Sequence, residues 1–191
     1  MYQACEKAKV CQKPSLSGSY SHLSYYGNQK YANYPVFFVS WVDARDYCTW
    51  VGRRLPTEAE WEKTARGTDE RIYPWGNTSP ICSLANFTTN GRTCFGDPSP
   101  VGSYLDGASP YGALDMAGNV MEWINDRYDP AYYSRSSQSD PPGPDNSDYR
   151  VIRGGSWYTD GSGLRATNRN FENPYNSYDT LGFRCARSVT P

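Results

Sequence analysis

The sequence is short of residues on which several large classes of protein depend. It contains a single histidine, His22, which weakens most catalytic hypotheses, because three-histidine zinc sites, paired-histidine iron sites and H-E-x-x-H proteases all need more than one imidazole. We expect His22 to occupy a surface position in a Tyr/Ser loop. No apolar run approaches the roughly 18 residues of a membrane-spanning helix. The charges of the 19 basic and 20 acidic residues nearly cancel, so the chain lacks the excess of basic residues expected of a nucleic-acid-binding protein.

Length and composition favour one loop-rich domain. Compact domains usually run to about 100–200 residues, and we treat residues 1–191 as a single domain. With 17 glycines and 14 prolines, regular structure should be the minority. The chain starts at Met1 without a charged and apolar leader, so no signal peptide is visible. Either a leader was removed or the sequence is a segment of a longer protein.

Six cysteines form an even set without tandem C-x-x-C spacing, which favours disulfides over zinc. The sequence alone allows 15 connectivities. Short spacing favours Cys5–Cys11 and Cys82–Cys94, which leaves Cys48 with Cys185, a bridge worth on the order of 5 kcal/mol because it closes a long loop. Disulfides would place the protein in a secreted, periplasmic or cell-surface location. Free buried thiols in a cytosolic protein are the alternative.

Two helices are predicted from their capping signals. Ser40 with Asp43 begins the first, whose apolar face continues to Val51 before Gly52 ends it. Thr57 and Glu60 form a capping box for the second, which should run to about residue 66.

The remainder is expected to be mostly loop with short strands. The first 34 residues show little periodicity, and turn dipeptides break up the chain after Gly67. Strands are plausible at 72–74, 120–124, 151–153 and 181–186.

Four segments resemble the formylglycine-generating-enzyme (sulfatase-modifying factor) family, whose fold is a variant of the C-type lectin fold. They are residues 52–62, 115–123, 153–157 and 181–185, and their order and spacing match over roughly residues 36–187. The resemblance implies a loop-rich α+β fold with two main helices and short antiparallel strands. Family members with cysteines at the positions of Cys48 and Cys185 pair those two.

The resemblance also implies a structural calcium ion. Its ligands would be the side chains of Asp115 and Glu122 and the carbonyl oxygens of Gly118 and Val120, and a glycine-containing turn between two carboxylates suits the six to eight oxygens that calcium takes. A second family site would use Asn86, although its other ligands fall in a rearranged region. The alternative is a solvated turn that binds no metal.

The residues that the family uses for catalysis are replaced at the matching positions of this sequence. The enzymes bind copper through two cysteines whose positions here are Thr159 and Leu164, and neither side chain supplies a thiolate. Related iron enzymes use histidines from an additional domain. We therefore expect neither copper nor iron, and no evident enzymatic activity.

The segment 158–180 is the predicted ligand-binding surface. It is rich in Tyr, Asn, Ser, Asp and Gly, a composition typical of antibody-like contact surfaces, and it is bracketed by two recognisable strands. The residues that we expect to contact ligand are Tyr158, Thr159, Asp160, Ser162, Asn170, Phe171, Tyr175, Asn176, Ser177, Tyr178, Asp179 and Thr180. Arg165, Ala166 and Arg169 look like buried or ion-paired scaffold positions. The alternative is that these tyrosines pack in the interior.

This arrangement also resembles the variable proteins of diversity-generating retroelements, which vary residues between a Gly-Gly-Ser-Trp strand and a Gly-Phe-Arg strand. The resemblance implies a non-catalytic domain that binds a protein or glycan surface. Two alternatives stay open: an ordinary accessory module of a larger enzyme, and a formylglycine-generating-enzyme-like oxidoreductase.

Overall fold

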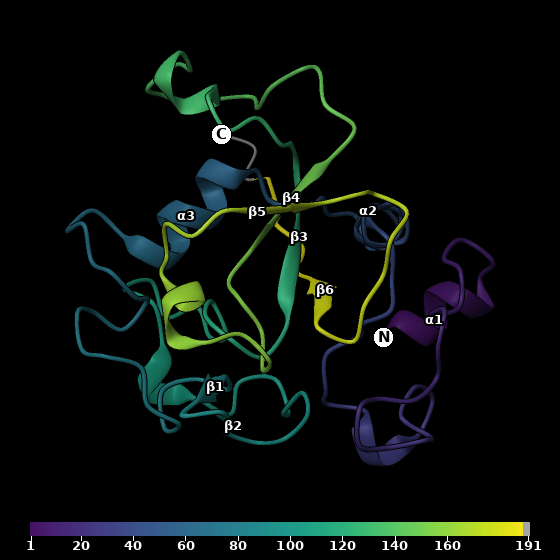
Figure 1. Cartoon of the computed structure of the whole chain (residues 1–191). Coiled ribbons are helices and arrows are strands. Elements are labelled where there is room, and N and C mark those ends of the chain that lie inside the picture. Colours follow the sequence, from purple (N-terminus) through teal and green to yellow (C-terminus); the bar gives the residue numbers. More distant parts are fainter. Residues whose placement is uncertain (189–191) are drawn as a thin grey trace.

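A four-stranded sheet forms the centre of a chain that is otherwise mostly irregular (Figure 1). The structure, a computed structural model, describes residues 1–188. The sheet has the strand order β5-β4-β3-β6. Its strands are β3 (Met121–Arg127), β4 (Arg150–Arg153), β5 (Asn170–Glu172) and β6 (Leu181–Phe183). The loop-rich α+β architecture predicted from the sequence is therefore confirmed.

The strand directions differ in one respect from the prediction. β4 pairs antiparallel with both β3 and β5, but β3 and β6 run parallel, with Glu122 opposite Gly182. The expectation of antiparallel strands alone was wrong here, because the loop between β5 and β6 crosses the sheet and returns the chain in the direction of β3.

The two predicted helices are present with their predicted caps. α2 (Trp41–Trp50) begins after Ser40, and α3 (Glu58–Arg66) begins after Thr57. Each starts with a capping box, in which the hydroxyl accepts from a backbone N–H three residues on and the acidic side chain there accepts from the cap backbone. Local sequence therefore fixes both helix starts.

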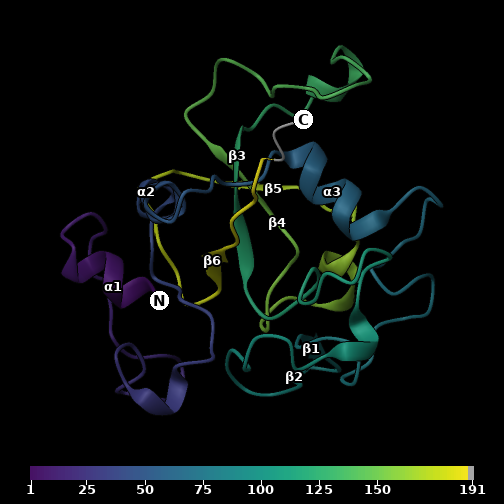
Figure 2. The same ribbon diagram turned by 180° about the vertical axis from the view of Figure 1, so that it is seen from behind.

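The hydrophobic core lies on both faces of the sheet. Trp123 and Ile152 pack with α2, whereas Ile124 and Val151 pack with Trp61 of α3. The period-two alternation of a strand accounts for this division, and Figure 2 shows α2 and α3 on opposite sides of the strands. The sheet thus lies between two helices.

The N-terminal segment has more regular structure than expected. α1 (Tyr2–Lys7) and a 3-10 helix at Gln29–Tyr31 fall within the 34 residues predicted to be mostly loop. α1 has no side-chain cap, and tertiary contacts hold it instead: Tyr2 and Cys5 are buried in the core that also contains α2. No local signal in the sequence points to such a helix.

Several short elements also differ from the prediction. Residues 72–74 form no strand, because the turn at Trp75 and Gly76 brings the chain back and leaves only one bridge, between Tyr73 and Gly76. β6 ends at Phe183, so the predicted strand to residue 186 is too long. The elements not predicted are β1 (Thr88–Thr89), β2 (Arg92–Thr93), β5 and the 3-10 helices Leu105–Gly107, Tyr132–Ser134 and Gly161–Leu164.

Three disulfides link the chain with the predicted connectivity. They are Cys5–Cys11, Cys48–Cys185 and Cys82–Cys94. The second joins α2 to the chain just after β6. Three disulfides are consistent with an extracellular or periplasmic protein. Within residues 1–188, no helix has the length and apolar character to cross a membrane.

Candidate functional site

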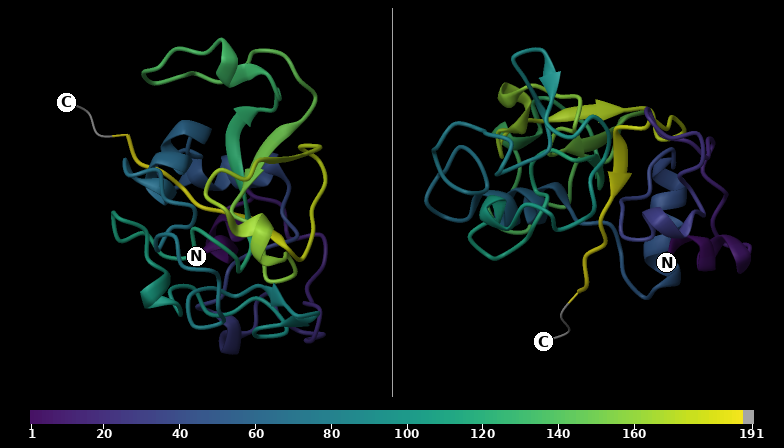
Figure 3. Two further views of the ribbon diagram at one scale, coloured as in Figure 1. Left: turned by 60° about the vertical axis from the view of Figure 1, so that its left-hand side comes forward. Right: turned by 90° about the horizontal axis from the view of Figure 1, so that it is seen from below.

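The predicted ligand-binding segment, residues 158–180, lies along one side of the molecule (Figure 3). None of its twelve candidate residues is buried. Tyr175 and Tyr158 retain 79% and 66% of their accessible surface, so their rings are not core residues. The exposed candidates are Tyr158, Asp160, Ser162, Asn170, Phe171, Tyr175, Asn176 and Tyr178; Thr159, Ser177, Asp179 and Thr180 are half-buried.

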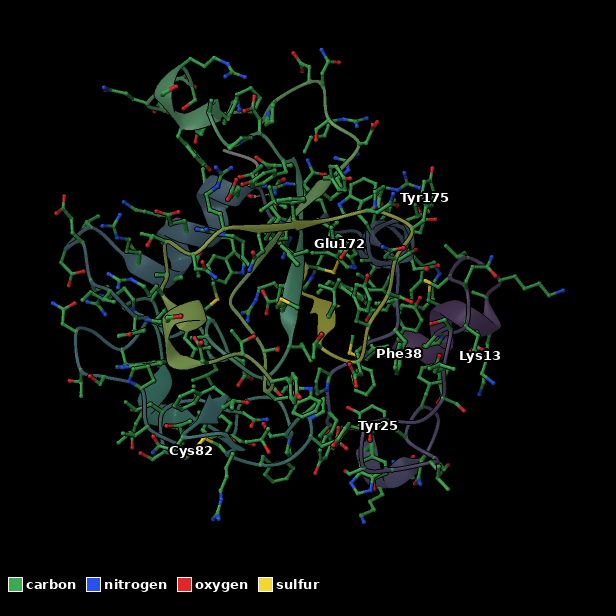
Figure 4. All side chains as sticks on the ribbon, viewed as in Figure 1. Lys13, Tyr25, Phe38, Cys82, Glu172 and Tyr175 are labelled. Atoms are coloured by element: carbon green, nitrogen blue, oxygen red, sulfur yellow. A yellow bond between two sulfur atoms is a disulfide. The ribbon has the colours of Figure 1, made fainter. Side chains whose placement is uncertain are left out.

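The loop between β5 and β6 is anchored to the rest of the chain mainly through its backbone, and its Asn176 side chain donates to Glu172 and to the Tyr178 hydroxyl. Three backbone N–H groups from elsewhere in the chain donate to its carbonyls: Trp41 to Pro174 (3.0 Å), Phe38 to Tyr178 (3.0 Å) and Met121 to Thr180 (2.7 Å). The indole of Trp157 also donates to the carbonyl of Asp179. Figure 4 places Tyr175 at the outer bend of this loop, near α2. Because these bonds use carbonyl oxygens, they do not depend on the identity of the side chains.

At the start of the segment, by contrast, side chains support the fold. Asp160 caps the 3-10 helix Gly161–Leu164 by accepting from the backbone of Ser162 and Gly163. The Thr159 hydroxyl accepts from the backbone of Ser156 at 3.0 Å. Asp160, Ser162 and Thr159 are thus engaged within the chain, unlike Tyr158 and Tyr175.

Phe171 on β5 belongs to an exposed aromatic cluster. Its ring stacks on Tyr128 with centroids 4.3 Å apart and meets Tyr149 edge-on at 5.1 Å. β5 is the outermost strand of the sheet on this side. A ligand lying over residues 170–178 would contact these packed aromatic rings.

Two of the three expected scaffold positions support the sheet. Ala166 is fully buried, and Arg169 forms a bidentate ion pair with buried Glu58 at 2.7 and 2.8 Å. Arg165 is exposed, so the expectation was wrong for that residue. The residues on either side of it, Leu164 and Ala166, are fully buried, so Arg165 is the exposed residue between two that face the core.

The two positions that the family resemblance assigns to catalytic cysteines are occupied by Thr159 and Leu164. Leu164 is fully buried in a cluster with Phe87 and Ala117, and Thr159 pairs with Ser156. All six cysteines of the chain are in disulfides. None of the six is therefore a free thiol in this structure.

The predicted calcium turn places its two carboxylates in different surroundings. Glu122 accepts two hydrogen bonds from Arg184, at 2.5 and 2.6 Å, and one from the indole of Trp61. Asp115 accepts from the backbone of Gly102, while its Oδ1 is buried without a partner. Burial raises the pKa of Asp115. Asp115 therefore has an oxygen to offer a cation, whereas the Arg184 guanidinium already neutralises Glu122.

Two further partnerless oxygens lie at Asn86 and Asp97, both buried. Oδ1 of each side chain has no hydrogen-bond partner, and the Asn86 amide donates to the carbonyl of Asp97 at 2.8 Å, so the two residues are adjacent. Calcium binds carboxylate and amide oxygens of this kind. Asp97 was missed by sequence reasoning, because nothing local marks this aspartate as buried. Within residues 1–188, no three Asp, Glu, His or Cys side chains converge into a metal-binding group.

Residues of the N-terminal loop border the segment and were also missed. Tyr20 is exposed, and its ring lies 5.5 Å from that of Trp157, which in turn meets Tyr158 edge-on. The hydroxyls of Ser15 and Ser177 are 2.9 Å apart. His22 is partly exposed, as expected, with Nε2 at 3.9 Å from Asp97. The Tyr/Ser composition of residues 15–26 is the one signal that could have indicated this role.

Comparison with known families gives a match over nearly the whole chain. Residues 5–189 match the family described as Sulfatase-modifying factor enzyme 1-like domain. A protein named serine/threonine-protein kinase pkn1 from Chlamydia caviae is 44% identical over 83% of this chain and 25% of its own length. A formylglycine-generating enzyme from Streptomyces coelicolor is 39% identical over 82% of this chain and 54% of its own. The chain thus spans about a quarter to a half of these relatives.

Two solved structures share the fold. PvdO from Pseudomonas aeruginosa superposes with a TM-score of 0.77 at 26% identity, over 98% of this chain and 75% of that chain. Treponema denticola variable protein 1 superposes with a TM-score of 0.75 at 22% identity, over 95% and 78%. The second likeness concerns the fold alone.

Proposed function

Because this chain belongs to the sulfatase-modifying factor enzyme 1-like family and has no thiol at the positions of the catalytic cysteines, we propose that it is a non-catalytic ligand-binding domain. Residues 158–180 would form its contact surface. The observation that carries this proposal is the way the β5–β6 loop is held: backbone carbonyls are bound by the scaffold, while Tyr175, Asn176 and Tyr178 remain exposed. A surface held in this way accepts new side chains without loss of the fold.

The ligand would be a protein or glycan surface. Exposed tyrosines and asparagines give broad polar contact with little loss of rotamer entropy. Tyr158, Phe171 and Tyr175 are exposed and belong to the segment that runs along one side of the molecule (Figure 3). Such a surface suits an extended partner better than a small molecule in a deep cavity.

We also propose that the segment is diversified, as in the variable proteins of retroelements. The likeness of the fold to Treponema denticola variable protein 1 supports this proposal. Exposed positions should then differ between copies of the gene in a population, while buried Leu164, Ala166 and ion-paired Arg169 stay constant. Variation that falls equally on both groups of positions would rule out this form of diversification.

Binding can be tested with a triple substitution. Tyr158, Tyr175 and Tyr178 changed together to alanine should abolish binding to a target found on an array of cell-surface proteins and glycans, with the melting temperature within a few degrees of wild type. The matched control changes Phe95, Leu105 and Tyr111, which are equally exposed and lie outside the segment. Loss of folding in the first variant would mean that these rings stabilise the core.

Structural calcium is proposed as part of the same scaffold. The partnerless buried oxygens of Asp115, Asn86 and Asp97 support it, because such oxygens are costly to bury unless a cation or water satisfies them. Asp115, with the carbonyls of Gly118 and Val120 and a Glu122 shared with Arg184, would brace the turn before β3. Asn86 with Asp97 would brace a second loop.

Chelation tests the calcium proposal. A chelator should lower the melting temperature by several degrees, and Asp115→Asn or Asn86→Ala should reduce that sensitivity. Glu122→Gln should reduce it as well, while Asp106→Asn, at an exposed position, should not. A melting temperature indifferent to chelator would refute both sites.

The alternative function is that of a formylglycine-generating-enzyme-like oxidoreductase, or of an accessory module of a larger enzyme. The 39% identity to an enzyme of Streptomyces coelicolor favours it. The test is incubation with copper, oxygen and a Cys-x-Pro-x-Arg peptide, followed by mass spectrometry. Our proposal predicts no conversion of cysteine to formylglycine, and clear conversion would overturn it.

A further inference from the structure

Two arginines face each other at one end of the central sheet. Arg127, the last residue of β3, is the direct antiparallel partner of Arg150, the first residue of β4. Like charges at directly opposite positions of neighbouring strands destabilise a sheet. Both side chains are half-buried, so water screens their repulsion only in part. The pair therefore costs stability unless a negative group neutralises it.

A third guanidinium lies beside this pair, on α2. The guanidinium carbons of Arg150 and Arg45 lie 3.7 and 5.3 Å from the ring centroid of Trp41. The pKa of Arg150 is lowered from its ordinary 12.5 to about 10, mainly by burial; the charges of Arg127 and Arg45 add to this effect, and Asp126 opposes it. Three positive groups thus repel one another in a chain whose net charge is −1.

Neighbouring carboxylates leave the two strand arginines without an ion pair. Glu172 lies opposite Arg150 on β5, but its carboxylate accepts from the Asn176 amide at 2.9 Å. Asp46 pairs with Arg45 on α2 itself. Within residues 1–188, neither of the strand arginines has a carboxylate at ion-pairing distance. An anion from outside the chain would supply the missing counter-charge.

Both strand arginines keep hydrogen-bond donors for such an anion. Arg127 donates through Nη1 to the carbonyl of Ser147, and Arg150 donates through Nη1 to that of Asn125. In the described part of the chain, Nε and Nη2 of each arginine make no hydrogen bond, and none of these nitrogens is buried without a partner. One nitrogen of each guanidinium is thus fixed by the backbone, while the others are open to a ligand.

We propose that Arg127 and Arg150, with Arg45 beside them, bind a tetrahedral oxyanion, the sulfate or phosphate group of a ligand. A carboxylate has two oxygens in one plane, which a single guanidinium satisfies with paired hydrogen bonds. A tetrahedral oxyanion presents oxygens in several directions, so it can bridge guanidinium groups on different elements. The inference goes beyond the proposed function, because no residue of 158–180 belongs to this arginine cluster.

The experiment is an NMR titration of the ¹⁵N-labelled full chain with inorganic sulfate, inorganic phosphate and acetate, at an ionic strength held constant with sodium chloride. We expect saturable shifts of the amides of Arg45, Arg127 and Arg150, with a dissociation constant on the order of 1 mM for sulfate or phosphate. Acetate should bind about tenfold more weakly.

Glucose 6-sulfate and glucose 6-phosphate then distinguish the source of the oxyanion. The ester that keeps the affinity of its inorganic ion identifies the class of ligand. If neither ester keeps it, the site takes the free ion.

Arg127→Gln should weaken the binding of sulfate and phosphate about tenfold. The matched control is Arg92→Gln, at an exposed arginine of the separate β1–β2 sheet, which should leave binding unchanged. If Arg127→Gln does not fold, the comparison of sulfate and phosphate with acetate on the wild-type chain still decides. The proposal is overturned by the absence of saturable shifts with both oxyanions, by equal binding of acetate, or by an Arg127→Gln variant that keeps the affinity.

Discussion

At the scale of single residues, buried charged side chains support the segment 158–180. Glu58 is buried and holds Arg169 through two hydrogen bonds, while Arg153, also buried, donates to Glu62 and to the carbonyls of Ala166 and Asn168. Arg153 therefore binds the backbone of the segment, and Glu58 binds the side chain of Arg169 within it. Breaking a buried pair of this kind leaves an uncompensated charge and is strongly destabilising.

Asp126 belongs to the same buried region and predicts a pH effect. Its carboxylate accepts from the backbone of Glu58 at 2.9 Å. The pKa of Asp126 is raised from its ordinary 3.8 to about 6, mainly by burial; the hydrogen bond from the Glu58 backbone and the charge of Arg150 oppose this rise, while the charges of Glu58 and Glu60 add to it. A folded-state pKa above the unfolded value gives stability that is complete below about pH 4 and lost as the pH rises through 6.

Asp126→Asn should therefore stabilise the protein by about 1–2 kcal/mol at pH 7.5 and have little effect at pH 4. The neutral amide keeps an oxygen to accept from Glu58 and avoids the cost of a buried charge. Urea unfolding at both pH values measures this difference. Asp106→Asn, at an exposed position, is the control. An effect of equal size at the two pH values would contradict the assignment.

At the scale of elements, local signals account for α2 and α3 but not for α1 or β5. Ser40 and Thr57 begin their helices through capping boxes that can be recognised in the sequence. α1 lacks a cap and is held by burial of Tyr2, and β5 forms by pairing with β4 within a run that has no strand periodicity. Elements held by tertiary contacts alone leave little trace in the local sequence. For the same reason Asp97, which lies next to Asn86 only in the fold, could not be predicted.

The disulfide between α2 and the chain after β6 should contribute most among the three. Cys48 and Cys185 are 137 positions apart, against six for Cys5 and Cys11. In the chain-entropy model, the long loop is worth about 5 kcal/mol and the short one about 2 kcal/mol. Replacing Cys48 and Cys185 by alanine should lower the free energy of unfolding by clearly more than replacing Cys5 and Cys11. Equal losses in urea unfolding would show that the long bridge adds no constraint of this kind.

At the scale of the whole molecule, one disulfide-linked scaffold presents the segment 158–180 along one side (Figure 3). The sequence indicated this surface through its composition and its bracketing strands. It could not indicate the aromatic core beside α1, because Tyr2, Tyr47 and Phe183 come together only when α1, α2 and β6 pack.

The central claim is that the scaffold tolerates any polar or aromatic side chain at the exposed positions of the segment. The most direct test compares the protease resistance of two libraries. In one, six exposed positions vary among Tyr, Asn, Ser, Asp, Thr, Gly and Phe: Tyr158, Asn170, Phe171, Tyr175, Asn176 and Tyr178. In the other, the same codons replace four supporting positions: Trp157, Leu164, Ala166 and Arg169. We predict that most members of the first library fold and most of the second do not. A first library that fails to fold as often as the second would contradict the claim.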